Sequence, residues 1–453
     1  MKLTYGISDK PKFGQLIVFA IQQLLAIMAA TLVVPVITNG NAGLTGENAM
    51  STAAALFGAG IGTLVYILFT KGKSPVFLGS SFAFLGSMAA AFAGAVSAQA
   101  GYVGLIIGAF FAGLVYVIIA LIVKFAGIGW INKLMPAAVI GPTVAIIGLS
   151  LAGNAVGDLQ TAPAGGDSRI AIVCGLVTLA VTMLCSTFGK KMMKLIPFIL
   201  GILAGYLVAS IFTVIGTVAN IPALMVINYE PLKALVADGI TLNTFFSVPG
   251  FTFLTAIKGI KEIDAAYIAT VAVAYLPVAF VVFAEHLADH KNISSIIEKD
   301  LLEEPGLHRT LLGDGVGSMA GAFFGGCPNT TYGESVACVA ITGNASVATI
   351  IAAAIGAIII SFLNPFVAFV NTIPSCVMGG VCMALYGFIA VSGLKMIQKV
   401  NLEANKNLFV VAVILIAGIG GLTVSFGKIT LTTVACALIL GIVTNLMLKK
   451  GED

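Results

Sequence analysis

Long apolar stretches follow one another along almost the whole chain, and only short polar breaks separate them. A helix needs about 20 apolar residues to cross the hydrocarbon core of a bilayer, and most of these stretches have that length. Charged residues make up only 9% of the chain and hydrophobic residues 59%, whereas roughly a quarter of the residues in a soluble protein are charged. The sequence therefore predicts one integral membrane domain, with the lipid bilayer as its main solvent.

The stretches amount to fourteen predicted spans. The first span is too long for a removable signal peptide and lacks the small-residue cleavage pattern. A further interfacial helix is expected within residues 240–260. The predicted spans are 14–38, 51–70, 76–97, 101–126, 134–153, 168–187, 195–217, 265–289, 308–325, 328–342, 345–369, 374–397, 407–426 and 429–448.

The basic residues predict the orientation. With fourteen spans and the N-terminus inside, alternate loops face the cytoplasm, and 18 of the 23 basic residues fall there. This excess follows the positive-inside rule, so we expect a multi-pass protein of the cell membrane with both termini in the cytoplasm. The longest basic group, Lys190, Lys191 and Lys194, is too short to indicate a nucleic-acid partner.

Cysteine and histidine usage argues against a metal site and against an enzyme. The seven cysteines lie in or beside apolar segments and form no CxxC pair, so we expect reduced thiols and no bound metal or other cofactor. Only three histidines are present, His286, His290 and His308, and no GxSxG or HExxH motif occurs. The chain is therefore not expected to be an enzyme.

Four acidic residues lie within or at the edge of apolar stretches, namely Glu285, Asp289, Asp314 and Glu334. A charge near the middle of a bilayer costs on the order of 3 kcal/mol, so such residues are normally kept for function. Asp289 and Asp314 also fit a second interpretation, in which they lie at helix ends among the lipid headgroups. For Glu285 and Glu334 the functional interpretation is favoured.

Glu285 and Asp289 are four residues apart, which places both carboxyl groups on one face of the eighth span. Two carboxylates one turn apart in a low dielectric repel each other, so at least one is expected to hold a proton near neutral pH and to release it when its surroundings change. These are the properties of a proton-coupling element. His286, about 100° further round the helix, is a third candidate, with either a carboxylate or a backbone group as its partner. In the other interpretation, Asp289 and His290 only cap the helix at the cytoplasmic interface.

Two stretches, residues 73–84 and 326–337, share a plan that does not suit a continuous helix: a proline, a short β-prone run, a glycine and then a helical sequence. Extended backbone at membrane depth is tolerated only where protein or a cavity satisfies its polar groups. We therefore expect short extended strands in spans 3 and 10, and helix N-termini that face a buried polar ligand. Because each stretch is the third of seven spans, we expect an all-α polytopic fold of two inverted repeats.

Four motifs resemble those of a known transporter family. They read FLGSSFAFLG, AEHLADHKNIS, KDLLEEPGLHRTLLGDG and GGCPNTTYGESVACVAITG, and they occur in the order and in the spans in which the nucleobase:ascorbate transporter family has them. The resemblance covers essentially the whole chain and is closest to the bacterial uracil permeases. It implies a homodimer whose subunits have two domains. The core domain would comprise residues 1–133 and 261–370, and the gate domain residues 134–260 and 371–453.

The resemblance also implies a substrate site between the two domains. Glu285 corresponds to the carboxylate that accepts ring N–H groups, and Glu334 to the carboxylate after the strand of span 10. Phe82 is expected to stack on the base, and the backbone around Tyr332 and Gly333 to supply further hydrogen bonds. The expected function is proton-coupled uptake of uracil, in which protonation of the Glu285 site accompanies binding. Sodium is the alternative coupling ion.

Three positions depart from the family pattern. Gln22-Gln23 stands where members usually have Gln-His, Asp289 stands where a subset has histidine, and Glu334-Ser335-Val336-Ala337 replaces the pattern acid-Asn-x-Gly. These departures leave xanthine or another purine as an alternative substrate, although purine members usually have Gln at the position of Glu334. An anion exchanger of similar architecture is a further alternative, but that class expects a cationic or neutral anion site.

Overall fold

The computed structural model describes residues 3–127, 129–163, 165–190, 192–237, 239–426 and 429–448. Most of this part of the chain is helical, and short turns join the helices. The elements in chain order are α1 (Phe13–Ala42), η1 (Gly46–Asn48), α2 (Thr52–Phe69), β1 (Leu78–Ser80), η2 (Phe82–Phe84), α3 (Leu85–Ala93), α4 (Ala98–Ala126), α5 (Gly129–Leu134), α6 (Ala137–Ser150), α7 (Ala152–Gln160), α8 (Ser168–Phe188), α9 (Met192–Leu195), α10 (Pro197–Val218), η3 (Pro222–Leu224), α11 (Glu230–Ala234), α12 (Leu242–Phe245), α13 (Thr252–Gly259), η4 (Ile260–Glu262), α14 (Ala265–Ile297), η5 (Leu302–Gly306), α15 (Leu307–Gly325), β2 (Asn329–Thr331), α16 (Gly333–Thr342), α17 (Val347–Ser361), α18 (Asn364–Thr372), α19 (Ser375–Ile397), α20 (Asn405–Ile419), β3 (Val424–Phe426), β4 (Ile429–Leu431) and α21 (Thr433–Met447).

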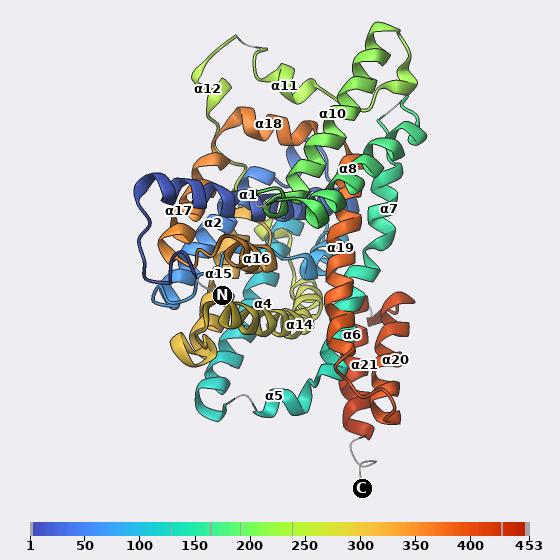
Figure 1. Cartoon of the computed structure of the whole chain (residues 1–453). Helices are drawn as coiled ribbons and strands as arrows, with labels where there is room; N and C mark the ends of the chain where they lie inside the picture. Colours follow the sequence, from blue (N-terminus) through green and yellow to red (C-terminus); the bar gives the residue numbers. More distant parts are fainter. Residues whose placement is uncertain are drawn as a thin grey trace.

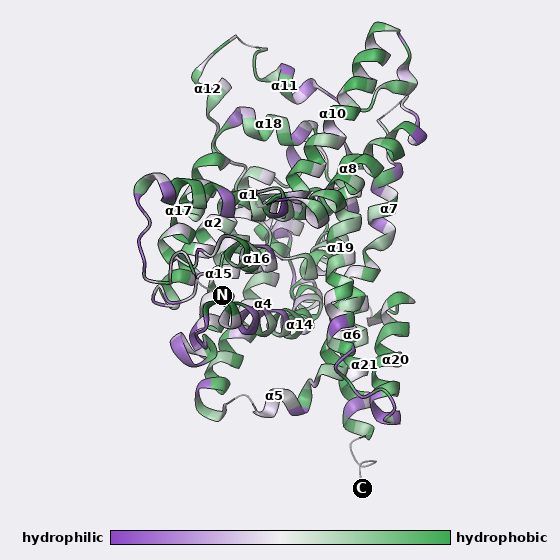
Figure 2. Cartoon of the chain, in the orientation of Figure 1, coloured by the Kyte–Doolittle hydropathy of each residue, from purple (hydrophilic) through white to green (hydrophobic). Residues whose placement is uncertain are grey.

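Within the described residues, eight helical segments are long and apolar enough to cross a membrane. They are Phe13–Ala42, Gly46–Phe69, Ala98–Ala126, Ala137–Gln160, Ser168–Phe188, Pro197–Val218, Ala265–Ile297 and Ser375–Ile397. Shorter apolar helices accompany them, including both helices that follow a strand, α3 and α16. Hydrophobic residues dominate these helices, and hydrophilic residues collect mainly in the turns (Figure 2). The prediction of a polytopic helical membrane protein is therefore confirmed.

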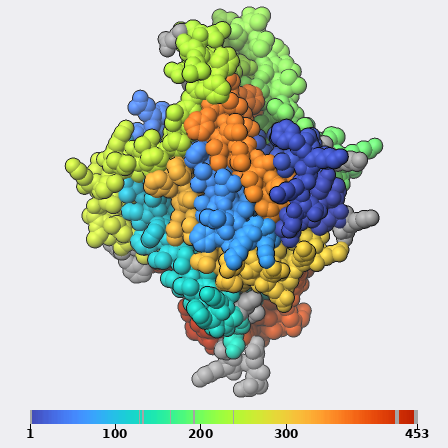
Figure 3. Space-filling model, turned by 90° about the vertical axis from the view of Figure 1, so that its left-hand side faces the viewer, coloured from blue at the N-terminus to red at the C-terminus, as the bar shows by residue number. Residues whose placement is uncertain are grey.

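The helices pack in two groups, which lie side by side in Figure 1. The first group is formed by α1, α2, α4, α14, α15 and α17, together with the two segments that contain strands. The second group is formed by α6, α8, α10, α19, α20 and α21. Figure 3 shows one face of the first group, where α17 and α2 lie next to each other and α1 packs beside α17.

Helix contacts in the first half of the chain have counterparts in the second half. Helix α1 of the first half packs against α17 of the second half, and α14 of the second half correspondingly packs against α4 of the first. Within the halves, α8 packs against α10, and α20 packs against α21. Between the halves, α8 contacts α19, and α20 correspondingly contacts α6. Two further pairs, α2 with α15 and α6 with α19, join equivalent helices of the two halves. This is the contact pattern of two related halves that pack against each other.

The two halves also meet through their strands. Strand β1 pairs antiparallel with β2, and Gly79 lies opposite Thr330 in the register. Two backbone hydrogen bonds flank the strands, from Ser81 N to Pro328 O (2.8 Å) and from Tyr332 N to Phe77 O (3.2 Å). Each strand therefore satisfies polar backbone groups of the other, as extended backbone at membrane depth requires. Both strands lie inside the stretches that the sequence predicted to be extended.

The structure differs from the predicted spans at several boundaries. The stretch 345–369 contains two helices, α17 and α18, because Pro365 favours the start of a new helix at this point. The stretch 134–153 is likewise divided, between α6 and α7. A second pair of antiparallel strands, β3 and β4, lies at the junction of the last two predicted spans and was not anticipated. The interfacial helix predicted within 240–260 is represented by the short helices α12 and α13.

The contact between α2 and α15 depends on glycine. A Cβ atom placed on Gly317 would lie 2.7 Å from Gly62 O and 2.8 Å from Leu78 Cδ1. Both distances are shorter than a normal van der Waals contact, and the first involves backbone that has little freedom to move. Helices α2 and α15 therefore approach each other closely only because these positions have no side chain.

We predict that Gly317→Ala lowers the free energy of unfolding by about 1–3 kcal/mol, because the added methyl group overpacks the contact between α2 and α15. The measurement is thermal unfolding of the purified protein in detergent. Gly387→Ala is the matched control, since a Cβ atom there meets nothing within 4 Å and alanine favours a helix more than glycine does. Equal stability of the two variants would contradict the assignment of a close contact.

Candidate functional site

A cavity of about 480 Å³ lies between the two groups of helices. The first group contributes carboxylates, strand residues and the start of α16. The second group contributes mostly apolar side chains, including Val144 and Ile147 of α6 and Phe198 of α10. Six residues singled out in the sequence line this cavity together, namely Phe82, Glu285, Asp289, Tyr332, Gly333 and Glu334. His286 does not line it.

The strands bring two helix N-termini to the cavity. Helix α16 begins at Gly333, directly after β2 and Tyr332, and its first turn contains Glu334. On the other strand, β1 is followed by Ser81 and then by the turn that contains Phe82. The first turn of a helix has N–H groups without helical partners, so the start of α16 offers hydrogen-bond donors beside the carboxyl group of Glu334.

Three carboxyl groups face this cavity from two helices. Glu285 and Asp289 lie one turn apart on α14, and Glu334 lies on α16. All three side chains are half-buried. The hydroxyl group of Thr331 on β2 donates a hydrogen bond to Asp289 Oδ2 at 2.8 Å, so that this carboxyl group is held against the strand. The interpretation of Asp289 as a helix cap among headgroups does not fit this position.

Aromatic side chains complete one end of the site. The ring of Phe82 contacts that of Tyr386 on α19 edge to face, with 6.0 Å between centroids and an interplanar angle of 79°. One face of Phe82 is therefore not used by this contact. The hydroxyl group of Tyr332 donates to Ser80 O at 2.6 Å, which fixes the Tyr332 side chain on β1.

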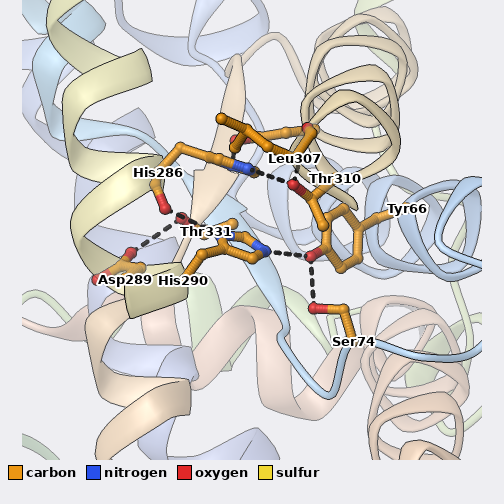
Figure 4. A network of polar contacts seen from close by, with 9 residues as sticks. Tyr66, Ser74, His286, Asp289, His290, Leu307, Thr310 and Thr331 are labelled. Carbon is orange, nitrogen blue, oxygen red and sulfur yellow. Dashed lines mark hydrogen bonds and ion pairs between the residues drawn. The ribbon is translucent and has the colours of Figure 1, made fainter. Parts of the chain in front are cut away.

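Behind the cavity, the side chain of His286 on α14 contacts a carboxyl group and a hydroxyl group of α15. Figure 4 shows the contact with the hydroxyl group of Thr310. The Nε2 atom of His286 lies 3.0 Å from Thr310 Oγ1, which itself donates to Leu307 O at 3.0 Å. Because the threonine proton is used there, Nε2 of His286 must be the donor in the first contact. The Nδ1 atom lies 2.7 Å from Asp314 Oδ2, and a contact this short needs one proton between the two atoms. The pair therefore shares one proton and is neutral overall.

The hydrogen bonds of His290 also determine its tautomer. Its Nδ1 atom lies 2.8 Å from His286 O, an acceptor, so that Nδ1 carries the proton. Its Nε2 atom then accepts from the hydroxyl group of Tyr66 at 2.7 Å, and the Tyr66 oxygen lies 2.7 Å from Ser74 Oγ (Figure 4). The two imidazole rings stack at 4.0 Å between centroids. Both histidines and Asp314 are buried in protein, so Asp314 does not lie among headgroups.

We predict that Tyr66→Phe lowers the free energy of unfolding by about 1–3 kcal/mol, because it leaves the buried Nε2 atom of His290 without a donor. Thermal unfolding measures this loss, and Tyr5→Phe, whose hydroxyl bond to Gln15 is exposed, is the control. The ¹⁵N chemical shifts of labelled histidine test the underlying assignment directly. A proton on Nε2 of His290 instead of Nδ1 would contradict it.

Comparison with known proteins assigns the chain to a family. A model of a permease family matches residues 14–426. The uracil permease of Bacillus subtilis (strain 168) is 36% identical over 461 residues, which cover 100% of this chain and 97% of that protein. The uracil permease of Escherichia coli (strain K12) is also 36% identical, over 98% of this chain and 94% of that protein. The putative pyrimidine permease RutG of the same strain is 28% identical, over 98% of this chain and 91% of that protein.

Solved structures show the same fold at low sequence identity. The transmembrane domain of a cyanobacterium bicarbonate transporter, BicA, superposes with a TM-score of 0.60 at 13% identity and covers 97% of this chain and 100% of that one. The murine anion transporter Slc26a9 in the inward-facing state gives a TM-score of 0.65 at 11% identity, over 98% of this chain and 69% of that one. The full-length sequence matches agree with the four motifs found in the sequence, and the chain belongs to this permease family of membrane transporters.

Proposed function

We propose that this permease takes up uracil across the cell membrane. The observation that carries the proposal is that Glu285 and Glu334, from different helices, face one cavity beside the start of α16. Uracil is planar and neutral, and it presents two N–H donors and two C=O acceptors. A site that recognises it needs strong acceptors, backbone donors and an aromatic surface. The cavity has all three, and the relatives at 36% identity are named uracil permeases.

In the proposed complex the carboxylates of Glu285 and Glu334 accept the ring N–H groups. Backbone N–H groups of the first turn of α16, starting at Gly333, donate to a carbonyl oxygen, and Phe82 stacks on the ring. A hydrogen bond to a charged group contributes roughly 1.5–3 kcal/mol, and stacking on an aromatic side chain about 1–3 kcal/mol. Three or four such contacts suffice for micromolar affinity after the cost of association.

Proton coupling is proposed to use Glu285 and Asp289. Two carboxyl groups one turn apart, with Glu334 across the cavity, repel one another when all are charged, and uptake of one proton relieves this repulsion. His286 has a different role in this proposal, because both of its ring nitrogens already have partners outside the cavity. It holds the proton that it shares with Asp314 and fixes α14 against α15.

The architecture proposed for transport has fourteen membrane segments in two inverted repeats, with both termini in the cytoplasm. The matched helix contacts and the antiparallel pairing of β1 with β2 support the repeats. In this proposal the first group of helices forms the core domain, residues 1–133 and 261–370, and the second forms the gate domain, residues 134–260 and 371–453. Helix α13, which falls in the proposed gate range, packs against α4 and α15 of the first group. Movement of one domain past the other exposes the cavity to either side of the membrane in turn.

The acidic lining distinguishes this proposal from anion exchange, although the solved anion transporters share the fold. Glu285, Asp289 and Glu334 all line the cavity, and the one basic residue among the described lining residues is the exposed Lys194. An anion would meet three carboxyl groups. Purines remain the second candidate class, since their ring N–H groups match the same acceptors.

We predict that Glu285→Gln and Glu334→Gln each weaken uracil binding about 10–150-fold, because each removes a charge-assisted hydrogen bond of roughly 1.5–3 kcal/mol. Isothermal titration of the purified variants measures the change. Glu47→Gln, at an exposed position outside the cavity, is the control and should bind like the unmodified protein. Unchanged affinity in both cavity variants would refute the site.

Uptake of labelled uracil into cells or proteoliposomes is expected to require a proton gradient. One proton crossing about 100 mV supplies roughly 2.3 kcal/mol, and each pH unit about 1.4 kcal/mol more. A protonophore should therefore abolish accumulation, whereas replacing sodium with potassium should leave it intact. Competition by excess xanthine, in parallel with excess uracil, tests the purine alternative. Accumulation that survives the protonophore and fails without sodium would overturn proton coupling.

A further inference from the structure

Two buried polar residues outside the cavity lining meet directly behind Glu334. Ser335 follows Glu334 in the first turn of α16 and is 0% exposed, and Gln23 of α1 is 2% exposed. The side-chain nitrogen of Gln23 donates to Ser335 Oγ across 312 residues of sequence. The backbone N–H group of Phe77, next to β1, donates to the same oxygen at 3.0 Å. One hydroxyl oxygen therefore joins α1, the β1 segment and α16.

We propose that Gln23 and Ser335 form a positioning pair that sets the affinity of the permease for its substrate. The inference rests on the proposed binding of uracil at Glu285 and Glu334. Ser335 is the covalent neighbour of Glu334, so any shift of Ser335 moves that carboxyl group and the first N–H groups of α16. Phe77 is held by Ser335 through its N–H group and by Tyr332 through its carbonyl group. The side chain of Ser335 thus extends the pairing between β1 and β2 by one hydrogen bond.

The hydrogen bonds between Gln23, Ser335 and Phe77 tolerate little change, because the side chains of Gln23 and Ser335 are buried. The Ser335 oxygen accepts from both Gln23 and Phe77 and is buried from solvent. Removing the hydroxyl group leaves two buried donors unsatisfied, and removing the amide leaves the Ser335 oxygen bonded to the β1 segment alone. Either change removes this hydrogen bond between α1 and the start of α16. Neither residue is among those that line the cavity, so both act on the ligand through Glu334.

The test is a double-mutant cycle on uracil affinity, measured by isothermal titration with the full-length protein. Gln23→Ala and Ser335→Ala should each weaken binding about tenfold, and the double alanine variant should be no more than about threefold weaker than either, because both remove one coupled unit. Ser87→Ala, which removes another buried serine hydroxyl, bonded to Ala274 O at 2.7 Å, is the matched control and should retain affinity. Effects that multiply in the double alanine variant, or full affinity in both single alanine variants, would overturn the pair.

A second readout does not depend on the ligand. Cys338 lies one turn further along α16, lines the cavity and is 3% exposed. Its alkylation rate, followed by mass spectrometry, should rise several-fold in Gln23→Ala and Ser335→Ala and stay unchanged in Ser87→Ala. If the unmodified protein fails to bind uracil, the proposed substrate is wrong and the alkylation rates still judge the pair. If uracil binds but neither affinity nor alkylation responds, the pair is wrong and the proposed function stands.

Discussion

The structure depends on one constraint: extended backbone in the middle of a membrane must find its hydrogen-bond partners within the protein. A single strand in hydrocarbon would leave N–H and C=O groups unpaired at several kcal/mol each. Strands β1 and β2 avoid this cost by pairing with each other, and side chains complete what the short ladder leaves open. Thr63 Oγ1 accepts from Leu78 N at 2.9 Å, and the hydroxyl group of Tyr332 donates to Ser80 O at 2.6 Å. The break in each helix is tolerated because the other break lies opposite.

The pairing of β1 with β2 determines where free backbone N–H groups and carboxyl groups face the cavity. Because the two strands pair side by side, α16 starts beside the turn that contains Phe82, and the free N–H groups of its first turn face a cavity instead of a preceding turn. Helix α14 passes the strands, and Thr331 of β2 holds Asp289 by a hydrogen bond. A second face of α14, about 100° further round the helix, carries His286 and His290 into neutral contacts with α15 and α2 in which all their ring nitrogens have partners. One helix thus presents its carboxylates to the cavity and its imidazoles to the protein interior.

Much of this arrangement was predictable from the sequence, and the rest was not, for identifiable reasons. The apolar stretches and the two proline-containing breaks predicted the membrane fold and the position of the strands, because hydrocarbon penalises charge and unpaired backbone wherever they occur. The grouping of Glu285 and Glu334 around one cavity followed from the same rule, whereas for Asp289 the sequence left open a second interpretation as a helix cap among headgroups. The partner of His286 did not follow from this rule, since Asp314 is reached only through the packing of α15 on α14. The contact of Gln23 with Ser335 was equally hidden, because periodicity carries no information on which residues of distant helices meet.

The polar residues that line the cavity lie mainly on the first group of helices, and this determines which group a bound ligand moves with. On the proposed assignment, every residue expected to contact uracil belongs to the first group: Glu285 on α14, Glu334 and Gly333 on α16, and Phe82 after β1. The second group lines the cavity mostly with apolar side chains of α6, α10 and α19, with Ser392 of α19 as a polar exception. A ligand held by hydrogen bonds moves with the body that donates and accepts them, whereas an apolar wall has no directional bonds to break as it slides. The strand pair and the buried histidine contacts tie the binding residues into one rigid unit, so the substrate can be carried past the wall without loss of the contacts that select it.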